Sequence, residues 1–425
     1  MLKRLFTFLR HPTSTAVIIN TLGNYLNVVF SVFFVYLLVR IISPAQYGVF
    51  SVLSSISYVL ANILDFGVTA SLYSYLPLHL EGDMKRAYKL IKSTFFYQTL
   101  LSSICVVLLI VLFPWADSVF FKTNAPYSTL LVTAFSVLFY VWQNYLGNCL
   151  YAAKRVMEVN LYSLIANVIK MVLIFILISL HLISVGVILF MFGIVGPMIF
   201  FFFVYRSKKN HMASVLAAPI DTSEFRIRYT FTNFIGYQLL NVGLRMDLFL
   251  IAFFRPKNEV GYYGLAQKII LTIMTTAVSI TQVISPAFAR IKSKKDVFPH
   301  VKSGVLYMLI PTAIFALLTV TPNWVFNIVF THSFGETAQI AHLLGLAYLL
   351  YPAISLFQLF LLYSAKKPKY NLYANALIFI IVTGGCYFFI PHYGIRAAAV
   401  SIASAFVLST VLLAYFSLSE YKKLV

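Results

Sequence analysis

Long apolar stretches alternate with short polar connections along the whole chain. A helix needs roughly 20 mostly apolar residues to cross the hydrocarbon core of a bilayer, and the chain offers twelve such stretches. They cover residues 15–39, 48–76, 94–114, 128–150, 160–180, 185–205, 230–254, 261–288, 304–321, 338–363, 371–390 and 395–416. The longest connection, residues 206–230, leaves no room for a soluble domain. The pattern predicts an all-α integral membrane protein with twelve transmembrane helices.

Composition supports this class and removes others. Of the 425 residues, 61% are hydrophobic and only 10% are charged, which leaves too little polar surface to enclose a water-soluble core. The net charge of +20 would suit a nucleic-acid partner, but no basic groove or stacking motif accompanies it. The three cysteines and eight histidines show no metal-ligand spacing. We therefore expect no nucleic acid, metal or cofactor.

The basic residues predict the orientation of the helices. Twenty-four of the 32 lysines and arginines fall on one side of the predicted topology, as is typical of cytoplasmic loops. The other side holds five, which are Arg40, Lys122, Arg255, Lys257 and Arg396. Both termini are therefore expected in the cytoplasm. The basic N-terminal segment has no small-residue cleavage site, so we expect it to be retained.

One short phrase occurs twice. LYAAKRVMEVNLY at residues 150–162 returns as LYSAKKPKYNLY at residues 362–373, each time at a predicted cytoplasmic turn. Two further pairs recur at nearly the same offset, Gly48 with Gly261 and Trp115 with Trp324. The repeat spans six helices, an even number, so the second half enters the membrane from the same side as the first. The halves are predicted to be parallel repeats related by an axis along the membrane normal.

This repeat predicts two lobes of six helices. We expect an N-terminal lobe at residues 1–210, a cytoplasmic linker at 211–229 and a C-terminal lobe at 230–425. Transporters built from repeats bind substrate at the repeat interface, so a cleft between the lobes is expected. The basic pair at each repeated turn fixes topology, and it can also attract an anionic lipid head group by about 1 kcal/mol per residue.

Five charged residues lie inside the predicted spans, where charge is costly and usually functional. They are Asp65, Lys170, Arg245, Asp247 and Lys268. Lys170 lies near the midplane, roughly 15 Å into its helix, and is the best candidate to bind an anionic group. The alternative is that Lys170 snorkels or pairs with a polar group that the sequence does not identify.

The remaining charges leave several roles open. Asp247 and Lys268 are expected at the same depth on adjacent helices, where they form either an ion pair or a substrate site. Arg245 lies about 200° around the helix from Asp247, so both cannot enter one narrow cavity. Asp65 can pair with a cation, cap a helix break near Gly67 or take part in ion coupling. Polar residues such as Asn241 and Gln282 suit hydrogen bonds either to sugars or between helices.

Several motifs resemble a known family. These are RIISPAQYGVFSVL after the first span, LDFGV in the second, and MDLFLIAFF with EVGYYGLAQKI in the seventh and eighth. With the KR and KK turns, they resemble the polysaccharide transporters of the MOP exporter superfamily, and most of all the O-antigen flippases of the Wzx type. The resemblance covers nearly the whole chain. It implies a V-shaped, bilobal bundle like that of the MATE transporters.

The resemblance also implies a function. Such a protein would move an undecaprenyl-diphosphate-linked oligosaccharide from the inner to the outer leaflet of a bacterial cytoplasmic membrane, by alternating access around a cationic cavity. Lys170, Arg245, Lys268 and Arg40 are then the candidate substrate-binding residues, and Asp65 and Asp247 are candidates for ion coupling or charge pairing. A polysaccharide polymerase and a chain-length regulator are candidate partners, besides membrane lipid.

Two other functions compete with this one. A drug or cation antiporter of the same superfamily would favour carboxylates over cations inside the membrane, whereas this chain has three basic and two acidic residues there. An integral-membrane polysaccharide polymerase should carry a sizeable outer loop with catalytic residues, or a metal-binding carboxylate cluster, and the sequence has neither. Lipid II and teichuronic acid exporters remain open as neighbours of the flippase hypothesis.

The charge bias gives a direct test of topology. Single cysteines introduced at Lys209 and Lys294 should resist a membrane-impermeant thiol reagent in intact cells, because both positions are expected in the cytoplasm. A cysteine at Asn124 should be labelled. The opposite labelling pattern would refute the predicted orientation.

Overall fold

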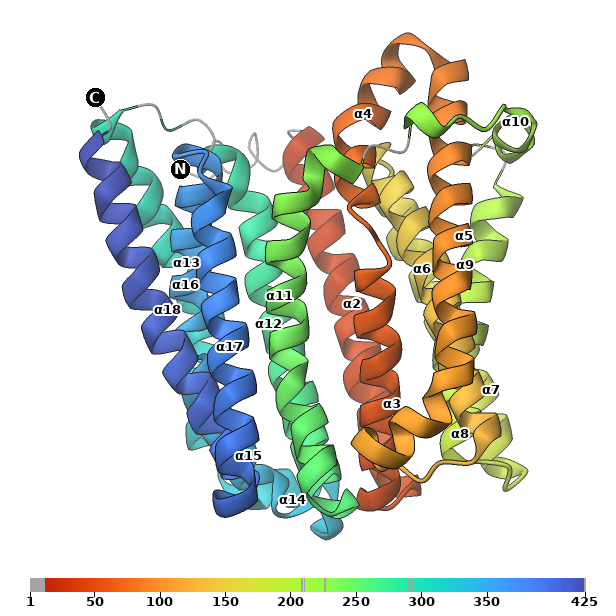
Figure 1. Cartoon of the computed structure of the whole chain (residues 1–425), viewed down its shortest axis with the longest axis vertical. Helices are drawn as coiled ribbons and strands as arrows, with labels where there is room; N and C mark the ends of the chain where they lie inside the picture. The colour runs from red at the N-terminus through yellow and green to blue at the C-terminus, as the bar shows by residue number, and fades with distance from the viewer. Residues whose placement is uncertain are drawn as a thin grey trace. The chain divides into compact units, whose positions relative to one another are not determined.

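The chain is helical throughout its described part in the computed structural model, which describes residues 12–207, 209, 211–224, 227–288, 291 and 293–423. Figure 1 shows the long helices. The chain divides into two compact units, and each is considered by itself. Unit 1 holds the residues up to Leu37, with Leu53–Ala116 and Asn124–Phe231. Unit 2 holds Leu38–Val52, Asp117–Thr123 and Thr232–Val425. Both the lobe boundaries and the cleft stay predictions.

Unit 1 is built mainly from the first half of the chain. Its helices are α2 (Pro12–Ile41) and α3 (Pro44–Ile63), both shared with unit 2, then α4 (Val68–Gly82), α5 (Met84–Ala116), α6 (Tyr127–Ala152), α7 (Val156–Ser179), α8 (Val185–Phe190), η2 (Met191–Val195), α9 (Gly196–Arg206), α10 (Met212–Ala217) and η4 (Thr222–Glu224). The η2 segment is a π-helix between α8 and α9. Its wider turn changes which side chains α8 and α9 present to α7.

Unit 2 is built mainly from the second half. Its elements are η1 (Asp117–Phe121), α11 (Ile227–Phe254), α12 (Lys257–Phe288), α13 (Lys294–Val320), α14 (Asn323–Phe330), η5 (His332–Phe334), α15 (Thr337–Tyr348), α16 (Tyr351–Leu359), η6 (Phe360–Ser364), α17 (Pro368–Tyr393) and α18 (Arg396–Lys423). Figure 1 shows α14 lying across the lower end of this unit, where the other helices run lengthwise. The sequence did not predict α14, which is too short to span a membrane.

The described helices confirm a multi-pass membrane fold. Ten of them are long and apolar enough to cross a bilayer, or eleven when α3 and α4 count as one bent span. The part of α2 whose side chains the structure describes, Tyr25–Ile41, is apolar but shorter than these spans. The count of twelve therefore stays a prediction.

The second predicted span is broken, which corrects the expectation of one continuous helix at residues 48–76. The axes of α3 and α4 meet at 50°. Phe66 and Gly67 both have positive φ, at 49° and 79°. Because two successive left-handed residues cannot continue a right-handed helix, the chain must turn at LDFG.

The repeated phrase forms a similar turn in both places. Lys154 and Lys366, which occupy equivalent positions in the two copies, both have left-handed backbone angles, with φ of 60° and 55°. After each lysine the next backbone N–H turns back to a carbonyl of the preceding helix, from Arg155 to Leu150 at 2.8 Å and from Lys367 to Leu361 at 2.9 Å. Such bonds satisfy carbonyls that the end of a helix leaves free. The repetition in sequence is therefore a repetition of local structure.

The other repeated motif brings its two copies into contact within unit 2. Gly48, in the first turn of α3, lies against the backbone of Lys257 and Gly261 at the start of α12. Gly261 lies against the carbonyl of Pro44 in return. A Cβ atom at either glycine would clash with backbone. Both copies therefore need glycine at this position, because two helix starts approach closely there.

Two of the five basic residues predicted on the outer side bind helix ends in unit 2. The Arg40 guanidinium donates to the carbonyl oxygens of Val329 at 2.7 Å and Ile328 at 3.0 Å, in the last turn of α14. The Lys122 ammonium donates to the carbonyl of Phe253 at 2.9 Å, at the end of α11. A cation at the C-terminus of a helix is favourable because it faces free carbonyls and the negative end of the helix dipole.

The segment predicted as a linker packs on α5 in unit 1. Lys89 forms an ion pair with Asp221 at 2.5 Å, and the Ser93 hydroxyl accepts from the Asp221 backbone N–H. The hydrogen bond from Lys89, followed by those from Ser223, lowers the pKa of the Asp221 carboxyl to about 2. Because this value lies below the ordinary one, what the group adds to stability is present above pH 4 or so and is lost as the pH falls toward 2.

We predict that Gly261→Ala destabilises the protein by about 1–3 kcal/mol, because the new methyl group must displace the Pro44 carbonyl. Gly384→Ala in α17 is the matched control, since nothing lies within 4 Å of a Cβ there and alanine favours the helix. Thermal unfolding in detergent measures both. Equal melting temperatures for the two variants would contradict the close contact.

Candidate functional site

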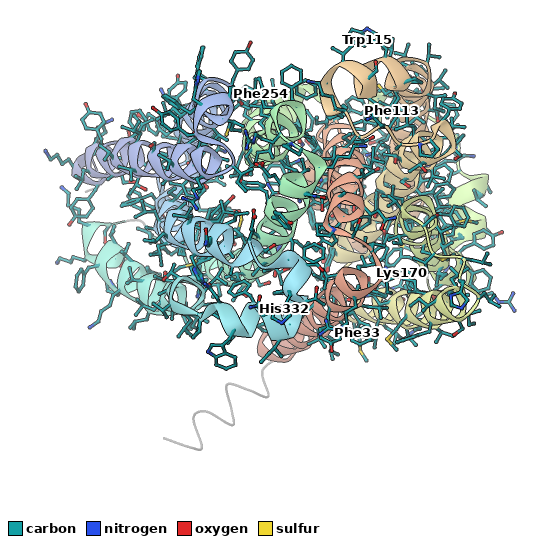
Figure 2. All side chains as sticks on the ribbon, turned by 90° about the horizontal axis from the view of Figure 1, so that it is seen from below. Phe33, Phe113, Trp115, Lys170, Phe254 and His332 are labelled. Atoms are coloured by element: carbon teal, nitrogen blue, oxygen red, sulfur yellow. The ribbon has the colours of Figure 1, made fainter. Side chains whose placement is uncertain are left out.

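Lys170 lies against two aromatic rings inside unit 1. It is half-buried on α7, nine residues before the end of that helix, or about 14 Å along the axis. Its ammonium is 5.0 Å from the ring centre of Phe192 in η2 and 5.6 Å from that of Phe34 in α2. Figure 2 labels Lys170 within the unit. Aromatic faces stabilise a cation in apolar surroundings without cancelling its charge.

The backbone opposite Lys170 leaves room for its side chain. Gly196, the first residue of α9, is close enough that a Cβ there would lie 3.0 Å from the lysine Cδ. The η2 π-helix ends directly before this glycine and carries Phe192. The π-helix and the glycine together therefore shape the environment of the lysine.

Polar side chains continue from Lys170 along α7. Asn160, Asn167 and Lys170 recur at helical spacing, and the Asn167 amide donates to the Asn27 carbonyl oxygen of α2 at 2.8 Å. This bond fixes α2 against α7 inside a strongly apolar region. The Asn27 pair is one of the helix-to-helix bonds that the sequence left open as an alternative to sugar binding.

Asp247 is the most buried charged residue of unit 2, with a side chain that is 0% exposed. Its carboxylate accepts three neutral donors: the Leu248 backbone N–H at 2.7 Å, the Gln267 amide at 2.8 Å and the Tyr263 hydroxyl at 2.5 Å. Buried carboxylates persist only when such donors replace water. Asp247 therefore does not form the ion pair with Lys268 that was one of the two predicted alternatives.

Arg245 and Lys268 lie beside this network. The Arg245 guanidinium donates to the Gln267 amide oxygen at 3.2 Å. Lys268 directly follows Gln267, yet its side chain is exposed, and it forms no ion pair with any described carboxylate. Arg245 and Lys268 thus contribute two positive charges around Gln267, and neighbouring positive charges raise the local attraction for an anion.

A polar face extends from these cations, and we call it the α11–α12 face. It consists of Tyr237, Asn241 and Arg245 on α11 and of Lys268, Thr272, Thr275, Ser279 and Gln282 on α12, each set at helical spacing. Lys268, Thr275 and Gln282 are exposed. Ionisable residues inside membrane spans usually face the interior of the helix bundle or a water-filled cavity. The sequence named Asn241 and Gln282 as candidates for sugar binding, and both belong to this set of residues.

Asp65 lies at the break between α3 and α4. Its carboxylate accepts from the Thr69 hydroxyl at 2.5 Å and from the Thr69 backbone N–H at 3.3 Å, in the first turn of α4. Asn148 of α6 donates to the same hydroxyl at 2.7 Å and accepts from Tyr73 at 3.3 Å. These contacts suit a residue that caps a helix break, which is one of the roles that the sequence left open for Asp65. A role in ion coupling stays a prediction.

The predicted site residues thus fall into separate groups. Arg245, Asp247 and Lys268 lie together in unit 2, Lys170 and Asp65 occupy different places in unit 1, and Arg40 caps α14. Sequence reasoning missed Gln267, Tyr263, Thr69 and Asn148 because it searched for charged partners of buried charges. Their signal was position alone, since Gln267 adjoins Lys268, and Thr69 lies one turn after Asp65.

The fold and these polar groups define a multi-pass membrane protein in which the spans carry cations and a hydrogen-bonded face. The family follows from the sequence, because the model of a family described as "Polysaccharide biosynthesis protein" matches residues 15–292. The chain belongs to this family. Among curated proteins no sequence matches the chain.

Solved transporter structures share this fold. The lipid II flippase MurJ in an inward closed conformation has a TM-score of 0.73 at 15% identity, covering 96% of this chain and 90% of the flippase. An inward-facing multidrug resistance MATE transporter of the MOP superfamily has a TM-score of 0.71 at 13% identity, with 96% and 98% covered. A MOP superfamily transporter from Pyrococcus furiosus has a TM-score of 0.66 at 14% identity, with 98% of both chains covered. These likenesses show that the chain has the same all-helical fold as these proteins.

We predict that Asp65→Ala destabilises the protein by about 0.5–2 kcal/mol, because the first turn of α4 loses its carboxylate acceptor. Asp65→Asn should recover most of that loss, since its amide oxygen can still accept from Thr69. Thermal unfolding of both variants checks this. If Asn and Ala are equally unstable, the negative charge itself, and not the cap, holds this residue in place.

Proposed function

We propose that this protein is a flippase that moves an undecaprenyl-diphosphate-linked oligosaccharide from the inner to the outer leaflet of a bacterial cytoplasmic membrane. The observation that carries the proposal is the unequal treatment of charges on the α11–α12 face. Asp247 is fully buried and bound by neutral donors, whereas Lys268 is exposed and Arg245 contacts a neutral amide. The accessible charge on this face is positive, which suits an anionic substrate.

The chemistry of a lipid-linked sugar matches these features. Its diphosphate and hydroxyl groups cannot cross hydrocarbon without polar partners. Arg245 can bind two phosphate oxygens through its guanidinium fork, and Lys268 can add a point charge. Amide and hydroxyl side chains such as Asn241, Thr275 and Gln282 supply hydrogen bonds for sugar rings. Membership of a polysaccharide biosynthesis family supports a glycan as the head group.

Lys170 provides the corresponding cation of unit 1. Its aromatic surroundings keep the ammonium deep in the span, and the polar residues of α7 lead toward it. We propose that Lys170 contributes to diphosphate binding during the transport cycle, which runs by alternating access. The glycan belongs to an O-antigen or capsular repeat unit in this proposal, and a polysaccharide polymerase and a chain-length regulator act after the flippase.

A cation antiporter of the same superfamily is the function that this proposal must exclude. Such a protein binds a positively charged drug or ion through an accessible carboxylate. Asp247 offers none, because its oxygens are engaged and shielded from solvent. Asp65 is half-buried and accepts hydrogen bonds at a helix break.

We predict that Lys170→Ala and Lys170→Glu abolish surface polysaccharide display in a host whose own flippase has been deleted, at normal abundance of the variant protein. Lys170→Arg should retain part of the display, because it keeps the charge but is bulkier and forked. Lys302→Ala, which removes an exposed lysine on α13, is the matched control and should leave display unchanged.

Transbilayer movement of a labelled lipid-diphosphate oligosaccharide in proteoliposomes separates transport from later steps of assembly. Full polysaccharide display and full lipid movement with Lys170→Ala would show that this lysine is not needed for transport. If the unmodified protein moves a cationic drug but no lipid diphosphate, the flippase proposal is wrong.

A further inference from the structure

One buried amide lies between the two oppositely charged residues of α11. Gln267 is 2% exposed. Its side-chain oxygen accepts from the Arg245 guanidinium at 3.2 Å, while its side-chain nitrogen donates to the Asp247 carboxylate at 2.8 Å and to the Leu244 carbonyl at 3.3 Å. All hydrogen-bonding groups of this side chain are therefore directed at α11.

The amide of Gln267 meets the needs of both neighbours, because it accepts and donates at two separate atoms. An ionised carboxylate can only accept hydrogen bonds and a guanidinium can only donate them, so a side chain that bridges them must do both. The same logic fixes which way the amide points, since its NH₂ group must face Asp247 and its oxygen must face Arg245. Tyr263, 0% exposed, holds the far oxygen of Asp247 at 2.5 Å and so anchors the whole chain of bonds.

The bridge has a consequence for the charge of Arg245. If the Asp247 carboxylate contacted the guanidinium directly, the two charges would form an ion pair, and the guanidinium would attract a second anion less strongly. Gln267 is itself held by the buried carboxylate, so it can hold the guanidinium in place without adding a charge. The Arg245 guanidinium is thereby held by an acceptor whose own position is fixed by Asp247.

We propose that Gln267 is a positioning residue that orients Arg245 for the anionic head group of the substrate, with Asp247 and Tyr263 as its anchor. This inference rests on the proposed function, because it assigns a task to Arg245 at the site described above. Gln267 does not touch the substrate in this proposal and acts only through Arg245.

The test is a double-mutant cycle on the full-length chain in lipid nanodiscs, with undecaprenyl diphosphate as the probe. Gln267→Met keeps the side-chain volume and removes all three side-chain hydrogen bonds, and it should weaken binding at least tenfold, about the effect of losing one hydrogen bond to a charged group. In an Arg245→Met background the same change should have no further effect. Gln358→Met, which removes another amide bond in unit 2 (to Asn375, 2.8 Å), is the matched control and should leave binding unchanged.

A second measurement needs no substrate. The rate at which phenylglyoxal modifies Arg245, followed by mass spectrometry, should change in Gln267→Met and not in Gln358→Met. Unchanged binding in Gln267→Met, or an equal loss in the Arg245→Met background, overturns the positioning role. An unchanged rate of modification overturns it as well. If the unmodified protein binds no undecaprenyl diphosphate while the rate changes as expected, the proposed function is wrong and the positioning of Arg245 by Gln267 stands.

Discussion

A carboxylate inside a membrane-spanning helix needs hydrogen-bond donors from the protein, because hydrocarbon supplies none. Asp247 shows how this chain meets that need, through a backbone N–H, an amide and a phenol hydroxyl. The donors that contact this carboxylate are all neutral, and Lys268 forms no ion pair with any carboxylate that the structure describes. One of these donors, Gln267, also contacts Arg245, so the hydrogen bonds of this carboxylate extend to a cation of the α11–α12 face.

The same requirement governs the backbone where helices stop. The carbonyls at the end of α14 are bound by Arg40, and that of Phe253 in the last turn of α11 by Lys122. At the α3–α4 break, Asp65 and Thr69 provide the side-chain bonds that the interrupted helix lacks. These charged residues satisfy the protein's own polar groups, whereas in the proposed function Lys268 is left for the substrate.

Apolar periodicity predicted the helices well, because a span needs only length and hydrophobicity. It missed the bend at LDFG, since one aspartate and one glycine barely change the apolar count of a long stretch. It also missed α14, whose eight residues are too few for a span. The two copies of the KR and KK turn were visible as a repeat, but the left-handed lysines within them were not, because nothing in the residue type requires that conformation.

The candidate site was predicted only in part, for a physical reason. Charged residues inside spans are conspicuous, so Arg245, Asp247 and Lys268 could be named from sequence. The partners of charged residues were harder to predict. Some are distant in the chain, as Val329 is from Arg40, 289 positions away. Others are neutral, as Gln267 is between Arg245 and Asp247. Whether a charged side chain finds a partner within the protein depends on the direction in which it points. Composition and spacing do not reveal that direction.

The central claim is that the accessible charge of the membrane-spanning site is positive and selects an anionic lipid. Native mass spectrometry of the purified full-length protein tests it most directly, in a mixture of equal amounts of an undecaprenyl-diphosphate-linked oligosaccharide and a cationic amphiphile with a tail of the same length. The account predicts that the protein retains the lipid diphosphate and releases the cation. Retention of the cationic amphiphile in preference to the diphosphate would contradict it.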